Sequence, residues 1–155
     1  MQPHNLLQSA TLLATARKGK PSQANLRRAI SSAYYAMFHC LAKSCADLII
    51  GGAGAAKSKP AWRQVYRALE HKPCASACKD KILAAFPKPI ADFANTFVTM
   101  QEKRHLADYD PFALFTKSEV IQDIAIIERA MAAFKNEDAK DRRAFCTFVL
   151  FKKRP

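Results

Sequence analysis

Apolar residues recur every three to four positions along most of the chain, which is the spacing of one face of an α-helix. Glycine, proline and helix-capping residues interrupt this pattern at intervals. The broadest apolar stripe lies in the longest segment, as expected for a helix that packs against several neighbours in a bundle. The pattern predicts helices over about residues 5–18, 23–50, 60–70, 75–86 and 90–107, and one more that starts after Thr116 and continues to Phe134.

The segment 142–151 has two interpretations. Its run from Phe145 to Phe151 has a strand-like composition, but no other segment predicts a strand that could pair with it. An isolated strand would leave its backbone groups unpaired, so we favour a terminal helix on the bundle or at a subunit contact, with a strand as the alternative. The expected fold is all-α: an up-and-down four-helix-type bundle with additional short helices and a C-terminal helix.

The chain has 155 residues, of which 50% are hydrophobic and only four are glycine. This composition predicts one folded domain over residues 1–155, with its core at about 23–134 and a basic C-terminal extension at 135–155. No run approaches the ~20 apolar residues of a membrane span. No basic region followed by an apolar stretch marks a secretory signal at the N-terminus. We therefore expect a cytoplasmic protein without membrane segments.

The chain contains five cysteines, an odd number that favours reduced thiols in the absence of an export signal. His71, Cys74 and Cys78 are residue types that bind zinc, but no second ligand pair accompanies them, and cysteines four apart are also ordinary helical spacing. Buried thiols are the favoured interpretation, and we expect neither a metal nor a cofactor. The motifs of conventional hydrolases are missing as well.

The net charge of +12 comes from 25 Lys and Arg against 13 Asp and Glu. Such an excess favours an acidic partner, and nucleic acid is the commonest one. The basic residues are spread along the chain, and no basic strand interleaved with aromatic residues is present to stack bases. This pattern predicts attraction to a phosphate backbone rather than readout of base sequence, with simple solubilisation as the alternative.

The segment RHLADYD, which begins at Arg104, concentrates ionisable groups at the end of a predicted helix. Arg104 lies seven residues after Phe97, on the same apolar face. A guanidinium there keeps its charge, so it must be paired, solvated in a cleft or used at an interface. In a purely structural interpretation Arg104 pairs with Asp108, Tyr109 packs with its hydroxyl satisfied, and Asp110–Pro111 forms a turn.

Two stretches together resemble one protein family. RRAISSAYYAMFH, which runs from Arg27 to His39, resembles the long second helix of HEPN domains, and RHLADYD resembles the R-x-x-A-D-Y string of one HEPN branch. The resemblance covers about residues 23–134. It implies an all-α up-and-down bundle that is usually dimeric and mostly prokaryotic. Many HEPN proteins are metal-independent ribonucleases of toxin–antitoxin and phage-defence systems, and others are partners of nucleotidyltransferase-fold proteins or inactive binding modules.

The resemblance also implies roles for individual residues. Arg104 matches the family's catalytic arginine and His105 matches the residue after it, while the positions of the family's catalytic histidine hold Tyr109 to Pro111. In the implied chemistry Arg104 stabilises phosphate charge, His105 acts as acid or base, and Asp108 and Tyr109 hold and orient. The residues expected to contact RNA or a nucleotide are Arg104, His39, Tyr35 and Arg28.

The favoured function is an RNA- or nucleotide-binding homodimer, with metal-independent RNA cleavage as an activity that the sequence leaves open. One alternative is a non-catalytic interaction module that binds a nucleotide or a partner such as a nucleotidyltransferase-fold protein. The other is a structural helical adaptor whose charge serves solubility. By itself, a lone histidine such as His39 is more often a satisfied residue on a helix face than a catalyst.

Overall fold

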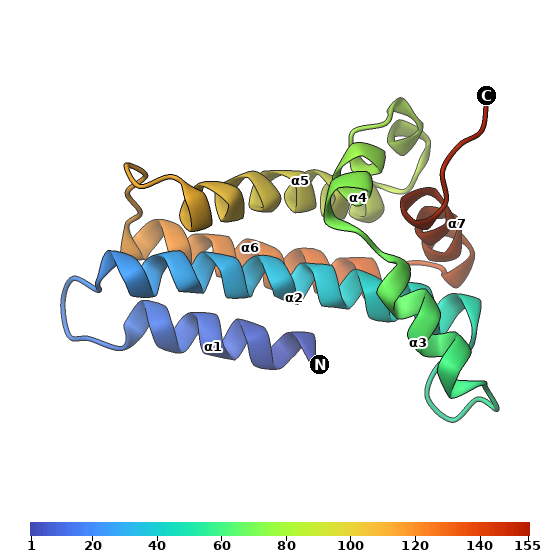
Figure 1. Cartoon of the computed structure of the whole chain (residues 1–155), viewed down its shortest axis with the longest axis horizontal. Coiled ribbons are helices and arrows are strands. Elements are labelled where there is room, and N and C mark those ends of the chain that lie inside the picture. The colour runs from blue at the N-terminus through green and yellow to red at the C-terminus, as the bar shows by residue number, and fades with distance from the viewer.

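The computed structural model describes residues 1–155 and contains helices and turns but no strands. Four long helices lie side by side along the molecule and alternate in direction (Figure 1). They are α1 (Pro3–Thr15), α2 (Gln23–Ile49), α5 (Lys88–Tyr109) and α6 (Lys117–Lys135). This arrangement confirms the predicted all-α up-and-down bundle.

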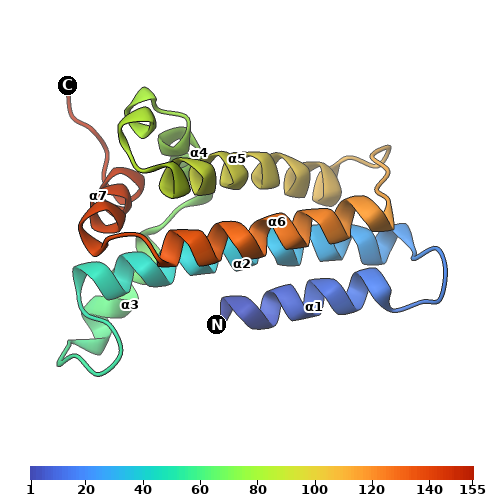
Figure 2. The ribbon, with the colours of Figure 1, turned by 180° about the vertical axis from the view of Figure 1, so that it is seen from behind.

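Shorter helices gather at one end of the bundle, as both views show (Figures 1 and 2). They are α3 (Lys59–Ala68), α4 (His71–Cys78), the 3-10 helix η1 (Lys81–Ala85) and α7 (Ala139–Leu150). Because α7 is helical, the expectation of a helix over 142–151 is confirmed and the strand alternative is wrong.

The single helix predicted over residues 75–86 is also wrong. The chain becomes helical at His71, because Pro73 lies in the first turn of α4, where a backbone N–H is not needed. After α4 ends, the side chain of Asp80 accepts a hydrogen bond from the backbone N–H of Ile82 at 2.9 Å and starts η1. This capping contact divides the segment into two short helices.

Side-chain caps set the starts of the long helices. The hydroxyl of Ser22 accepts a hydrogen bond from the backbone N–H of Asn25 at 3.2 Å at the start of α2. Thr116 does the same for Glu119 at 3.2 Å, which confirms the predicted helix start there. Between α1 and α2, Gly19 turns the chain with a φ of +85°, a conformation that glycine adopts without strain.

One hydrophobic core of 35 buried residues joins the helices, with α2 in contact with α1, α3, α5, α6 and α7. The rings of Phe93 (α5) and Phe134 (α6) stack with centroids 4.6 Å apart, and Phe145 of α7 meets both edge-on. Leu7 of α1 is also buried in this core. The core therefore extends beyond the predicted limits of 23–134, and α7 is docked on it rather than forming part of an extension.

All five cysteines are buried free thiols. Two of them, Cys74 and Cys78, lie on the inner side of α4. No His, Cys, Asp or Glu side chains form a group of three or more that could hold a metal ion. None of the helices combines the length and the apolar character needed to cross a membrane.

Candidate functional site

Arg104 lies where the buried stripe of α5 meets α2. It follows the buried residues Phe97 and Met100, and its own side chain is only 13% exposed. Its guanidinium carbon is 5.2 Å from the ring centroid of Tyr34 and 5.9 Å from that of Tyr35. Aromatic faces attract a cation at this range, so α2 helps to hold the guanidinium in place. The predicted position on the core-facing side of the helix is confirmed.

Arg104 has one ionic partner within the chain. Its Nη1 lies 3.3 Å from Oδ2 of Asp108, and Oδ1 of the same carboxylate accepts a hydrogen bond from Ser31. Nε of Arg104 is buried and has no partner, the only side-chain nitrogen or oxygen in that situation. Nη2 also lacks a hydrogen bond within the chain, so it must reach solvent. The predicted ion pair is confirmed, but it leaves the guanidinium incompletely satisfied.

Two pockets flank this end of α5. We call the first the α4 pocket; it has a volume of about 550 Å³ and is lined by His71, Lys72, Gln101, Glu102, Arg104, His105 and Leu106. We call the second the α1 groove; it has a volume of about 790 Å³ and is lined by Met1, Leu6, Leu13, Ala24, Arg27, Arg28, Ser31, Ser32, Tyr35, His39, Ala107, Asp108 and Tyr109.

The predicted site residues divide between the two pockets. Arg104 and His105 line the α4 pocket, whereas Asp108 and Tyr109 line the α1 groove. The α1 groove also holds the other three predicted contact residues, Arg28, Tyr35 and His39. A division of this kind arises because successive residues of an α-helix point about 100° apart. A single chain therefore does not bring all the predicted residues into one cleft.

His71 of α4 is a site residue that sequence reasoning missed. Its Nδ1 lies 2.7 Å from the hydroxyl of Tyr34, and its ring stacks on Phe38 at 4.0 Å. The side-chain amide of Gln101 donates a hydrogen bond to its backbone carbonyl at 2.9 Å. Burial lowers the pKa of His71, and the nearby charge of Arg104 lowers it further. Since Gln101 is 30 positions away in the chain, no local pattern indicates this contact.

His39 is held in a similar way on the side of the α1 groove. Its Nδ1 lies 2.6 Å from the hydroxyl of Tyr66 on α3, and burial lowers its pKa. The interpretation of His39 as a satisfied residue on a helix face agrees with this contact. Its Nδ1 is therefore not free for a ligand.

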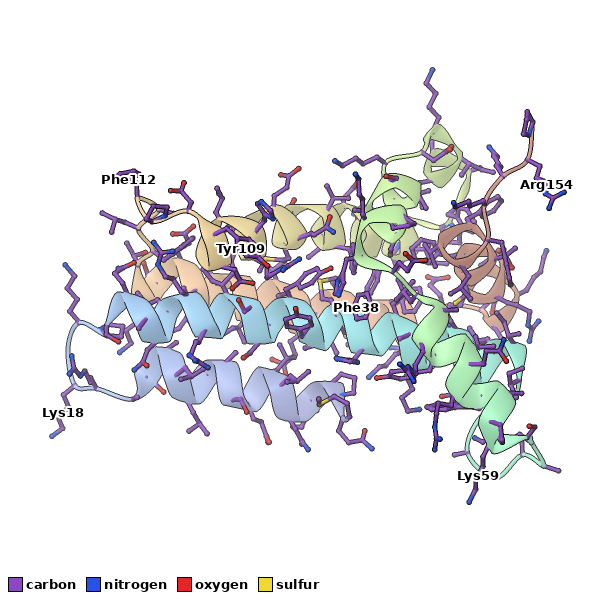
Figure 3. All side chains as sticks on the ribbon, viewed as in Figure 1. Lys18, Phe38, Lys59, Tyr109, Phe112 and Arg154 are labelled. Atoms are coloured by element: carbon purple, nitrogen blue, oxygen red, sulfur yellow. The ribbon has the colours of Figure 1, made fainter.

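Tyr109 does not pack as the structural interpretation expects. Its side chain is 68% exposed, and its hydroxyl makes no hydrogen bond within the chain. Phe112 and Leu114, in the loop that follows, are 89% and 78% exposed, and Leu106 is 45% exposed. We call these four residues the α5-end patch. Figure 3 shows Phe112 at the end of the bundle that lies away from α4 and α7.

Arg27, in the first of the two resembling strings, has a structural role. Its Nη1 donates hydrogen bonds to the backbone carbonyls of Ala107 at 2.9 Å and Asp110 at 2.8 Å. Its Nη2 donates to Pro111 and Ala113. These bonds fix the C-terminal end of α5, so the string on α2 holds the string on α5 in place.

The comparisons with known proteins return nothing: no family model, curated protein or solved structure matches the chain. The HEPN resemblance therefore rests on the two strings RRAISSAYYAMFH and RHLADYD.

Proposed function

We propose that the protein binds RNA and that Arg104 holds a backbone phosphate in the α4 pocket. The observation that carries this proposal is the incomplete pairing of Arg104, whose Nη2 reaches solvent. A planar guanidinium with free donors matches the oxygens of a phosphate. Lys72 and His105 line the same pocket and add donors to it. Its one carboxylate, Glu102, lies 4.0 Å from Lys79.

The overall charge favours RNA over a free nucleotide as the ligand. The excess of +12 is spread over the chain, so a polymer of phosphates can contact more of it than a single nucleotide can. This reasoning also supports a salt-dependent affinity without strong sequence preference.

The activity that we propose for this site is metal-independent RNA cleavage. His105 takes the proton of a ribose 2′-hydroxyl, and the 2′-oxygen attacks the adjacent phosphorus. The bond from phosphorus to the 5′-oxygen breaks, and that oxygen takes a proton from water, which leaves a 2′,3′-cyclic phosphate and a 5′-hydroxyl. Arg104 stabilises the charge on the phosphorane, and Asp108 orients the guanidinium. The ring of Tyr109, 5.0 Å from that of His105, positions the imidazole.

The wider setting that we propose follows the resemblance. It is a prokaryotic, HEPN-like ribonuclease of a toxin–antitoxin or defence system. Its five free thiols suit the reducing cytoplasm. The exposed α5-end patch favours a second copy of the chain as a partner. The same patch would serve a nucleotidyltransferase-fold partner if the protein acts as a non-catalytic module.

Binding is tested with a short fluorescent single-stranded RNA by anisotropy. We expect Arg104→Gln to weaken binding about tenfold or more, since it removes a charge-assisted phosphate contact. The matched control is Arg129→Gln, which removes the same charge from an exposed position on α6. Wild-type affinity should fall steeply between ~50 mM and ~200 mM salt. Equal affinities for the two variants would reject Arg104 as the phosphate ligand.

Cleavage is tested with the same RNA in excess EDTA, with analysis of the product ends. We expect cyclic phosphate ends from the wild type and a loss of about a hundredfold or more in rate for His105→Ala. Undiminished cleavage by both His105→Ala and Arg104→Gln would point to a contaminating nuclease. RNA binding without any cleavage would leave the non-catalytic module as the function.

A further inference from the structure

His71 has one ring nitrogen tied to the protein and one left over. Nδ1 is hydrogen-bonded to the hydroxyl of Tyr34, whereas Nε2 has no partner within the chain. Because Arg104 Nε is the only buried side-chain nitrogen or oxygen without a partner, Nε2 of His71 must reach solvent. His71 is among the residues that line the α4 pocket, in which we place the phosphate.

The surroundings of Tyr34 decide which nitrogen of His71 carries the hydrogen. Tyr34 is completely buried, and His71 is the only hydrogen-bond partner of its hydroxyl. If His71 donated to Tyr34, the phenolic O–H would be a buried donor without an acceptor, which is costly. Burial also raises the pKa of Tyr34, so the hydroxyl keeps its proton. Tyr34 therefore donates to Nδ1, and the hydrogen of the neutral imidazole sits on Nε2.

We propose that His71 is a second phosphate ligand of the α4 pocket and that it binds as a neutral imidazole, donating its Nε2–H to a phosphate oxygen beside Arg104. This inference rests on the proposed RNA-binding function. In the cleavage reaction His71 then assists Arg104 in stabilising the phosphorane charge, and the proton transfer is left to His105. Tyr34 is a positioning residue, since it acts on the ligand only through His71.

The charges around His71 support the neutral form. Burial is the largest cause of the lowered pKa of His71, and the charges of Arg104 and His39 lower that pKa further. The ionisable groups near it are Tyr34, Tyr35 and His39 on α2, Glu102, Arg104 and His105 on α5, and its chain neighbours Glu70 and Lys72. Of the two carboxylates, Glu102 lies 4.0 Å from Lys79, and Glu70 is exposed and does not line the α4 pocket. The charge of Arg104 therefore disfavours the protonated imidazole.

The tautomer is measured first, on the wild-type protein without RNA, by long-range ¹H–¹⁵N correlation NMR of the histidine rings. We expect the Nε2–H form of His71 at neutral pH. In Tyr34→Phe, we expect a mixture of the two tautomers, because Nδ1 has lost its donor. A His71 that carries its hydrogen on Nδ1, or on both nitrogens at neutral pH, would overturn the proposal.

RNA affinity is then compared for two substitutions of His71. The amide of His71→Gln places a neutral donor near the position of Nε2, so we expect binding within about threefold of the wild type. His71→Leu has no donor, and we expect a loss of about tenfold. Thermal melts establish that both variants are folded. Equal affinity of His71→Leu and wild type would remove His71 from the site.

These outcomes separate the two proposals. A loss of affinity in Arg104→Gln but not in His71→Leu leaves the phosphate site in place and overturns the role of His71. An unchanged affinity in both variants rejects the proposed function itself, and the inference with it. The pH dependence of RNA affinity is a further check. If affinity falls sharply between about pH 5 and pH 8 in the wild type but not in His71→Gln, His71 binds as a cation and the proposed neutral form is wrong.

Discussion

His39 and His71 share an arrangement that makes folding sensitive to acid. Each has its Nδ1 bonded to a phenol, and burial lowers the pKa of each below the ordinary value of 6.5. As the pH falls below about 6.5, the unfolded chain takes up protons that the folded chain does not, so stability decreases. The decrease ends once the pH has passed the lowered pKa of the folded state.

We therefore expect the free energy of unfolding in urea to decrease as the pH falls from about 7 to about 5. The decrease should be smaller in the double variant His39→Gln/His71→Gln. The exposed His4 provides the control, because His4→Gln should leave the pH dependence as it is in the wild type. An unchanged dependence in the double variant would mean that other groups cause it.

Arg27 is the residue that fixes the end of α5. In Arg27→Ala the carbonyls that it satisfies, among them those of Ala107 and Asp110, lose a charged donor. We expect a loss of about 1.5–3 kcal/mol in the free energy of unfolding, measured in urea. Faster hydrogen exchange after residue 107 should accompany it. The exposed neighbour gives the control: Arg28→Ala should change stability by less than about 0.5 kcal/mol.

At the scale of the helices, α7 extends the hydrophobic core beyond the four long helices. Phe145 is completely buried and contacts the rings of Phe93 and Phe134. We expect Phe145→Ala to lower the free energy of unfolding by about 3–5 kcal/mol, as for other aromatic residues removed from a core. Phe151 is 63% exposed just beyond α7, so Phe151→Ala should have little effect. A small effect at both positions would mean that α7 is not part of the cooperative fold.

In the homodimer that we propose, the α5-end patch is the contact between the two copies. Phe112 and Leu114 expose most of their apolar surface, and a second copy would bury it. By light scattering we expect about twice the chain mass of 17.3 kDa for the wild type. The double variant Phe112→Asp/Leu114→Asp should have the mass of one chain.

Leu12 is the control for this measurement, because it lies on α1 and is 70% exposed. Leu12→Asp should leave the wild-type mass unchanged. A wild-type mass of one chain at ~200 mM salt, where charge repulsion is screened, would contradict the proposed dimer.

Local patterns in the sequence were sufficient for most helices and for the position of Arg104. The spacing from Phe97 to Arg104 and the cap at Thr116 depend on residues within two turns of each other, so they can be read without the fold. The sequence pattern predicts one helix where the structure has α4 and η1, because the boundary between them depends on a single capping side chain, that of Asp80.

The site was harder to predict than the helices. The contact between Gln101 and His71 joins positions 30 apart, so it depends on how α4 lies against α5. Helix geometry alone predicts that His105 and Asp108 point in different directions. The two pockets that these residues line also depend on the positions of α1 and α4, which no local pattern gives. The purely structural interpretation has Tyr109 packed, yet its side chain is 68% exposed and lines the α1 groove, which depends on where α1 and α2 lie.

The buried cysteines can report the local opening of individual helices. Cys74 and Cys78 are on the buried face of α4, Cys146 is on the buried face of α7, and Cys40 is on the central helix α2. A maleimide can reach such a sulfur only while the helix that carries it is detached from the core, so the labelling rate measures how often that helix opens. Under native conditions the cysteines of α4 and α7 should be labelled before Cys40. The order of labelling would then show whether α4, which carries His71, opens independently of the long helices.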